Sequence, residues 1–310
     1  MNKKITVEDI KKQLEEEEYI ASDEIVYALY TALVLNKPIL VDGPAGVGKT
    51  ELAKVMAKLL DTELIRMQCY DGIDAAKVLY DINYPKQLLY QNILKSKLDE
   101  ILAEKDFHEA VEAIDRETSF YGEGFIIERP ILKALAPKDG KKKTILLDEI
   151  DKTDAEAESL LLETLSDFTL SIPEFGTITC PDELRPFVIL TSNNNRELSE
   201  ALRRRCVYLH ISYPTVELES KIIEKKAKVS VEFANAIAKT ISNIRDRDLR
   251  QKPSIAESIE WATVLFHHLG ITTENNLSDK SLELVLENSL HVLIKNQRDL
   301  DDVKGFIRGR

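Results

Sequence analysis

Short apolar runs alternate with helical patterns over the first 213 residues of the chain. The apolar runs have the length of buried strands, and they lie at residues 39–42, 64–67, 144–149 and 186–193. Helical periodicity is found at residues 22–35 and 50–60. A first helix is expected over residues 6–20, because Thr6 and Asp9 have the spacing of a helix cap. Strands that alternate with helices predict the α/β class, with a parallel β-sheet flanked by helices.

Two segments depart from this alternation. Residues 85–135 are charged and helical in pattern, which predicts a helical insert. Residues 167–179 alternate apolar and polar positions around Pro173-Glu174, which predicts a β-hairpin. After Pro214 the strand signals stop, and helices are expected at residues 216–228, 231–245, 254–269 and 281–297. The pattern therefore predicts an α/β core domain of residues 1–213 and a small all-α lid domain of residues 214–310.

Composition narrows the class of protein. The chain has 310 residues, of which 44% are hydrophobic, so it can bury a full core. Its formal net charge of −12 argues against a broad nucleic-acid-binding surface. The three cysteines lack CxxC spacing, which argues against a disulfide framework or a zinc site. We expect a cytoplasmic protein, since the N-terminus lacks the apolar stretch of a signal peptide and no uncharged run reaches about 18 residues.

A complete GxxxxGK[ST] loop follows the apolar run at residues 39–42. A strand, a glycine turn and a helix in this order direct backbone N–H groups and a helix N-terminus at one point, which suits a polyphosphate. Lys49 is expected to reach the β- and γ-phosphates of ATP, and the Thr50 hydroxyl to hold Mg²⁺. The predicted nucleotide-binding residues are Gly43, Pro44, Ala45, Gly46, Val47, Gly48, Lys49, Thr50 and Glu51.

Two carboxylates end the strand at residues 144–149. In P-loop enzymes a carboxylate at such a strand end holds the Mg²⁺ shell, and Asp148 is the candidate. Glu149 follows at once and is the candidate general base that deprotonates the attacking water. Hydrolysis of ATP to ADP and phosphate is therefore favoured over transfer to a substrate hydroxyl.

A third strand ends in small polar residues, with Asn193 at its end. An asparagine there can bond a γ-phosphate or fix the attacking water. The string Arg203-Arg204-Arg205 follows, and one of these arginines, acting on a neighbouring subunit, could stabilise charge on the transferring phosphoryl group. Arg204 and Arg205 are both kept as candidates.

This order of elements resembles the AAA+ ATPases. Finer matches resemble the MoxR group and, within it, the CoxD-like branch that accompanies carbon monoxide dehydrogenase maturation. The resemblance covers about residues 20–265, and the passages that carry it are residues 67–74 with Tyr80 and Asn83-Tyr84, 147–152, 162–168, 190–198, 203–206 and 252–257.

The resemblance implies a hexameric ring that acts as a chaperone-like remodelling machine. It also implies a von Willebrand A-domain partner and a metalloenzyme client. Lids of this family supply a basic second sensor to the γ-phosphate. Here Lys252-Pro253-Ser254 stands where many relatives have an arginine, so Lys252 or Arg250 is the candidate for that role.

Two other functions stay open at this point. A small-molecule P-loop kinase would keep Lys49 and Thr50, but the Asp148-Glu149 pair and Asn193 argue against it. A DNA-directed AAA+ ATPase, of the restriction or clamp-loader type, is disfavoured by the acidic charge. ATP turnover that DNA stimulates, and that falls steeply with salt, would support the DNA-directed function.

Overall fold

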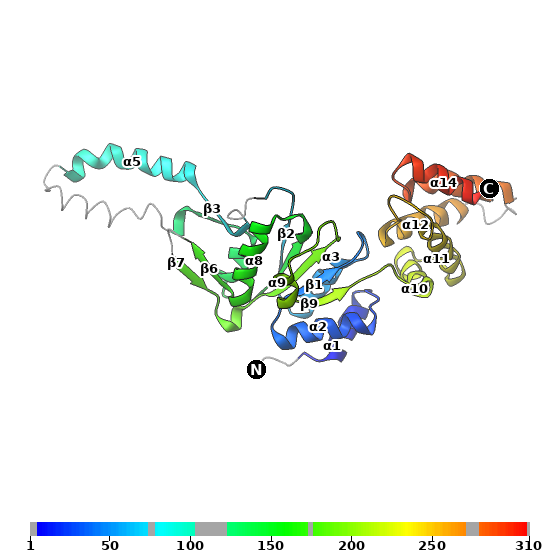
Figure 1. Ribbon diagram of the computed structural model, residues 1–310, viewed down its shortest axis with the longest axis horizontal. Helices are drawn as coiled ribbons and strands as arrows, with labels where there is room; N and C mark the ends of the chain where they lie inside the picture. The colour runs from blue at the N-terminus through cyan, green and yellow to red at the C-terminus, as the bar shows by residue number, and fades with distance from the viewer. Residues whose placement is uncertain (1–4, 74–77, 103–122, 173–175, 271–278, 309–310) are drawn as a thin grey trace. The chain divides into compact units, whose positions relative to one another are not determined.

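The computed structural model describes residues 5–73, 78–102, 123–172, 176–270 and 279–308 (Figure 1). Its strands are β1 Ile39–Asp42, β2 Glu63–Gln68, β3 Tyr80–Ile82, β4 Ile126–Glu128, β5 Lys143–Asp148, β6 Thr169–Ile172, β7 Gly176–Thr179, β8 Phe187–Ser192 and β9 Val207–His210. Its α-helices are α1 Val7–Glu16, α2 Asp23–Leu35, α3 Lys49–Leu59, α5 Tyr84–Leu102, α7 Pro130–Leu135, α8 Ala155–Asp167, α9 Glu200–Arg205, α10 Val216–Ala227, α11 Val231–Arg245, α12 Ile255–Gly270, α13 Asp279–Ser289 and α14 Gln297–Ile307.

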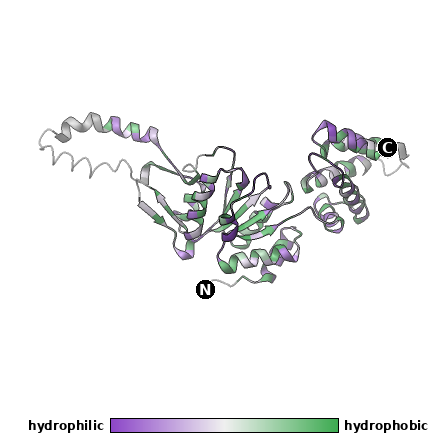
Figure 2. Cartoon of the chain, viewed as in Figure 1, coloured by the Kyte–Doolittle hydropathy of each residue, from purple (hydrophilic) through white to green (hydrophobic). Residues whose placement is uncertain are grey.

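A five-stranded parallel sheet in the order β2-β5-β8-β1-β9 confirms the predicted α/β class. The register aligns Gln68 of β2 with Asp148, and Leu147 of β5 with Leu190 of β8. Every residue of β5 and β8 is buried, as expected for central strands of a parallel sheet covered on both faces. Figure 2 shows the hydrophobic colour along these strands, while the helices α10 to α14 mix polar and apolar residues. Strand β9 was not predicted from the sequence.

The chain divides into two compact units, each with its own core. One consists of residues 1–31, 41–55 and 208–310, and the other of residues 32–40 and 56–207. In the second unit, side chains of β2, β5, β8, α7 and α8 form one apolar cluster. In the first unit, the core of the helices α10 to α14 surrounds the fully buried Trp261.

Two predictions in the second unit had different outcomes. The hairpin is confirmed, because β6 and β7 pair antiparallel, although its turn at Pro173-Glu174 lies outside the described residues. The helical reading of residues 85–135 is wrong in part. Helices α5 and α7 are present, but Ile126–Glu128 is a strand that pairs with β3, and an ion pair of 2.8 Å between Arg129 and Asp81 accompanies the pairing. Residues 103–122 lie outside the described part.

The helices near the C-terminus, α13 and α14, also differ from the prediction. A single helix was expected over residues 281–297, but α13 ends at Ser289 and α14 begins after Asn296. The Ser289 hydroxyl accepts a 2.8 Å hydrogen bond from Trp261 Nε1, and the Asn296 side chain caps α14 by accepting from the Asp299 amide. A polar side chain that caps a neighbouring backbone amide, as Asn296 does, favours a helix end over a helix interior.

A buried ion pair fixes three elements of the helical bundle to one another. Arg245 on α11 donates to both carboxylate oxygens of Glu219 on α10, at 2.6 and 2.8 Å. It also donates to the Pro253 carbonyl at 2.8 Å and to the Ser258 hydroxyl at 3.2 Å. Its guanidinium lies 4.6 Å from the ring centre of Tyr213. These bonds satisfy a charge that would otherwise be costly to bury.

Replacing Arg245 with methionine is expected to lower the free energy of unfolding by about 3–5 kcal/mol, because Glu219 is left buried without its cation. Urea unfolding followed by the fluorescence of Trp261, the chain's single tryptophan, measures this loss in the bundle itself.

Arg247→Met is the matched control. Arg247 also pairs with a carboxylate, that of Asp302, and lies 5.2 Å from the ring centre of Phe306. Its pair is partly exposed to solvent, so a clearly smaller loss is expected than for Arg245→Met. Equal losses in the two variants would contradict the role given to burial.

Candidate functional site

The phosphate-binding loop is built on glycines that no other residue could replace without strain. Gly43, Gly46 and Gly48 have φ values of 148°, 74° and 94°. A Cβ atom at Gly43 would also overlap the carbonyl of Ile211, and one at Gly46 would overlap the side chain of Ser254. The positions of these three glycines in the sequence are therefore required by the backbone conformation of the loop.

The side chain of Lys49 is folded onto this loop. Lys49 is the first residue of α3 and is only 6% exposed. Its ammonium donates to the carbonyl of Gly43 at 2.5 Å and to that of Pro44 at 2.8 Å. The Lys49 ammonium, which is predicted to bind phosphate, is thus held against the backbone carbonyls of the loop. Thr50 is half-buried beside it, and Glu51 is exposed and pairs with Lys54 at 2.6 Å.

A cavity of about 390 Å³ opens beside the loop within the same unit. Gly46, Val47, Gly48 and Glu51 line one part of it, and the Tyr19 ring lies against Gly48. Its apolar walls come from α2 and the segment before it, from the segment after β9, and from α10 and α12. They include Ile20, Ile25, Ile211, Tyr213, Pro214, Leu218, Ile222, Ile255 and Ile259. An apolar cavity next to a phosphate loop can hold a planar base. The sequence motifs included Ile255, and Pro214 marked the end of the strand signals, but no residue of these apolar walls was predicted to bind a ligand.

The helix α12 contacts the loop through its backbone. The Ile255 amide donates to the Gly46 carbonyl at 3.2 Å. Ser254 and Glu257 form a reciprocal cap at this helix start, because each side chain accepts from the other's amide. Lys252 and Arg250 lie just before the helix, are exposed and do not line the cavity described above. Their role as second sensor stays a prediction.

Asp148 lies at the end of β5 and is 5% exposed. Its Oδ1 atom accepts a 2.5 Å hydrogen bond from the Thr191 hydroxyl of β8, and its Oδ2 atom accepts a 2.5 Å bond from Arg66 of β2. The sequence predicted Asp148 but neither of these partners. A carboxylate and a hydroxyl such as that of Thr50 are the hard oxygen donors that Mg²⁺ prefers, so the residue types fit the metal.

Glu149 has a left-handed backbone, with φ 58° and ψ 50°, which is uncommon for a non-glycine residue. Its amide donates to the Thr191 hydroxyl at 3.0 Å. Its Oε1 atom accepts a 3.2 Å hydrogen bond from Asn193 Nδ2, and its Oε2 atom pairs with Lys152 at 2.6 Å. The structure therefore brings Glu149 and Asn193 together, although 44 residues separate them in the chain. Strain of this kind is concentrated at functional sites.

Asp151 positions the segment that carries Asn193. Its side chain is buried, and its Oδ2 atom accepts from the amides of Asn193 at 3.2 Å and Asn195 at 2.9 Å. Asp151 and Lys152 belong to the motif at residues 147–152, but no role was predicted for them from the sequence. The sequence signal for these two residues is their position just after Asp148 and Glu149.

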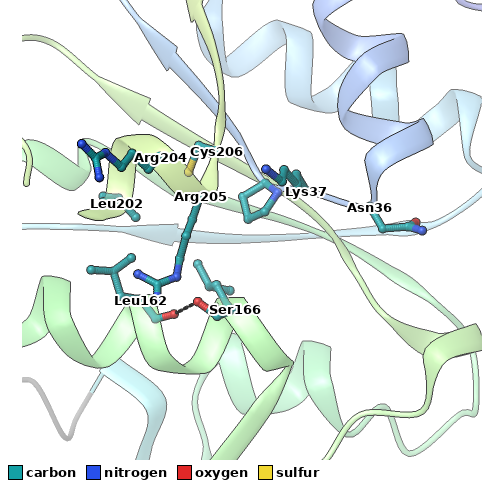
Figure 3. Close-up of a pocket in the computed structure, with 10 residues that line it drawn as sticks. Asn36, Lys37, Leu162, Ser166, Leu202, Arg204, Arg205 and Cys206 are labelled. Atoms are coloured by element: carbon teal, nitrogen blue, oxygen red, sulfur yellow. Dashed lines mark hydrogen bonds between the residues drawn. The ribbon is translucent and has the colours of Figure 1, made fainter. Parts of the chain in front are cut away.

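The consecutive arginines of α9 differ in their surroundings. Arg204 forms an ion pair with Glu200, one turn earlier on its own helix. Arg205 points away from Arg204, toward Leu162 and Ser166 of α8, and lines a cavity of about 210 Å³ (Figure 3). Among the described residues, Arg205 forms no hydrogen bond or ion pair.

The three cysteines are free thiols. Cys69 follows β2 and is buried, and burial, together with nearby carboxylates such as Asp148, raises the pKa of its thiol to about 12. Burial likewise raises the pKa of the Cys206 thiol to about 12. Thiols that stay protonated near neutral pH are poor nucleophiles, so these two do not add covalent chemistry to the site.

Comparison with known proteins identifies the family. Residues 38–206, more than half of the chain, match the family model described as AAA domain (dynein-related subfamily). The chain is 24% identical to an uncharacterized protein of Staphylococcus aureus (strain USA300) over 216 residues, 67% of this chain and 68% of that protein. It is 23% identical to one of Staphylococcus saprophyticus over 219 residues, which is 68% of this chain and 70% of that protein.

Solved structures and hydropathy add two findings. The Thermotoga maritima RuvB Holliday junction branch migration motor is similar with a TM-score of 0.46 and 19% identity, covering 93% of this chain and 70% of that one. Within the described part of the chain, no helix has both the length and the apolar character needed to cross a bilayer. The match over residues 38–206, which run from the start of β1 past α9, places the chain in the AAA domain family, dynein-related subfamily.

Proposed function

We propose that this AAA+ ATPase hydrolyses ATP with Mg²⁺ and works as a hexameric ring that remodels a partner protein. The observation that carries the proposal is the cluster at the ends of β5 and β8. There Thr191 bonds Asp148 and the Glu149 amide, and Asn193 bonds the Glu149 carboxylate. A carboxylate held next to an asparagine amide is suited to accept a proton from a water that the amide orients.

The roles follow from the chemistry of each group. The loop amides and Lys49 would bind the β- and γ-phosphates, and Thr50 and Asp148 would hold Mg²⁺, which would supply positive charge that neutralises the phosphates. The oxygen of a water molecule attacks the γ-phosphorus while its proton passes to Glu149. The bond from the γ-phosphorus to the bridging oxygen breaks, and ADP leaves. The apolar cavity beside Gly48 takes the base.

The ring proposal rests on the arginines and on the family. AAA+ proteins commonly assemble as rings, and an arginine that completes the neighbour's site makes hydrolysis depend on assembly. Arg205 is the better candidate, because its guanidinium is not neutralised by a partner in the described part of its own chain.

The finer assignment follows the sequence motifs. We propose a cytoplasmic MoxR-group ATPase of the CoxD-like branch, with a von Willebrand A-domain partner and a metalloenzyme client. A core of residues 1–213 and a lid of residues 214–310 are proposed as its domains. Co-purification with a von Willebrand A-domain protein whose binding requires ATP would support this assignment, and a partner of another class would redirect it.

Lys49→Ala tests the nucleotide site directly. The loss of the ammonium that neutralises phosphate charge is expected to weaken binding of a fluorescent ATP analogue by about a hundredfold or more and to remove phosphate release. Lys54→Ala is the matched control, because Lys54 lies on the same helix and is exposed. Unchanged binding by Lys49→Ala would contradict the proposed function.

A further inference from the structure

We propose that Arg66 competes with Mg²⁺ for the carboxylate of Asp148, so that the metal must displace an internal cation before the site is complete. This inference rests on the proposed function, since it concerns the metal of the same reaction. It assigns a positioning role to a residue of β2 that the sequence motifs do not single out.

The geometry places Arg66 on the strand next to Asp148. In the register of β2 with β5, Arg66 is aligned with Leu146, and Gln68 is aligned with Asp148. The Arg66 side chain extends along the strand toward the carboxyl end of the sheet. Its Nη2 atom donates to Asp148 Oδ2 at 2.5 Å and to Gln68 Oε1 at 2.9 Å. The guanidinium therefore contacts the carboxylate that is proposed to hold the metal.

The two ends of this ion pair differ in exposure. The Asp148 side chain is 8% exposed, whereas that of Arg66 is 52% exposed. The Thr191 hydroxyl occupies Oδ1 from β8, so the Arg66 bond lies on the other oxygen. A half-exposed arginine can move toward solvent, while a buried aspartate cannot. If a cation arrives at Asp148, Arg66 is the group that gives way.

Competition follows from charge. A guanidinium in contact with a carboxylate oxygen offsets the negative charge that attracts Mg²⁺, and two cations on one carboxylate repel each other. Without the metal, the same contact places a cation against the buried Asp148 carboxylate and offsets part of the cost of burying its charge. Arg66 is thus expected to stabilise the metal-free site and to raise the Mg²⁺ concentration that the site requires.

The test is a Mg²⁺ titration of nucleotide binding by the full chain. Binding of a fluorescent ADP analogue is measured at increasing Mg²⁺ for the wild type and for Arg66→Gln. The variant is expected to reach half-saturation at about two- to fivefold lower Mg²⁺, the range for loss of one partly exposed ion pair. Arg129→Gln, which breaks the pair with Asp81 on β3, is the control and should match the wild type.

Arg66→Lys is a second variant in case the glutamine disturbs folding. Lysine keeps the charge but lacks the planar fork, so a smaller decrease in the required Mg²⁺ is expected. An unchanged or increased Mg²⁺ requirement in the Arg66 variants would overturn the competition and leave the proposed function standing. Nucleotide binding by the wild type that is indifferent to Mg²⁺ would instead contradict both.

Discussion

Glu149→Gln is expected to lower ATP turnover by about a thousandfold while ATP stays bound, because an amide cannot take the proton of the attacking water. The glutamine oxygen can still accept from Asn193 Nδ2, so the local geometry should persist, although the ion pair with Lys152 is lost. Phosphate release under saturating Mg²⁺ and ATP gives the rate, and the nucleotide retained after gel filtration gives the occupancy.

Glu156→Gln provides the control for this variant. Glu156 is exposed in the first turn of α8, and its replacement should leave turnover unchanged. A Glu149→Gln protein that keeps turnover within about tenfold of the wild type would argue that Glu149 is not the general base.

The same variant reports on assembly. With ATP trapped, light scattering should give six times the chain mass of 35.2 kDa, or about 211 kDa. A mass that stays at 35.2 kDa would contradict the ring formed by this chain alone. The trapped ring is also the form with which to capture the client.

The second large effect is expected at Arg205. Arg205→Ala should lower turnover about a thousandfold, the range seen when an arginine that stabilises the transferring phosphoryl group is removed. Nucleotide binding should change little, since Arg205 is proposed to act on the neighbour's site. Arg204→Ala is the matched control, because Arg204 is paired with Glu200 on its own helix, and it should keep most of the activity.

Mixing two inactive proteins distinguishes action on a neighbour from action within one chain. Lys49→Ala subunits lack a nucleotide site but retain Arg205, whereas Arg205→Ala subunits retain the nucleotide site. Mixed rings contain some complete sites, so turnover should recover in part. Failure to recover, or an equal loss in Arg204→Ala, would remove Arg205 from the proposed role.

The parts of the fold that the sequence predicted are those with a local cause. The loop at residues 43–50 is recognisable because its glycines occupy backbone conformations that side chains disfavour. Strands β5 and β8 are recognisable because burial on both faces gives each a continuous apolar run, at residues 145–147 and 187–190. The predicted caps at Thr6 and Asp9 are also present.

The features that were missed depend on partners far away in the chain. Ile126–Glu128 forms a strand by pairing with Tyr80–Ile82, and three residues do not identify a partner in another part of the chain. The bond from Thr191 to Asp148 spans 43 residues, and that from Arg66 to Asp148 spans 82. The assignment of catalytic roles stays a prediction, since a motif names residue types and not the atoms they act on.

The hydrogen bond from the Ile255 amide to the Gly46 carbonyl connects the start of α12 directly to the phosphate loop. Any rotation of the Gly46 peptide when phosphate fills the loop must stretch this bond or move the start of α12 with it. Information about occupancy can then pass through the main chain, where a substitution that keeps the backbone amide leaves the bond in place. Alanine scanning of α12 would consequently underestimate its coupling to the phosphate loop, and replacing the Ile255 backbone amide by an ester would measure that coupling.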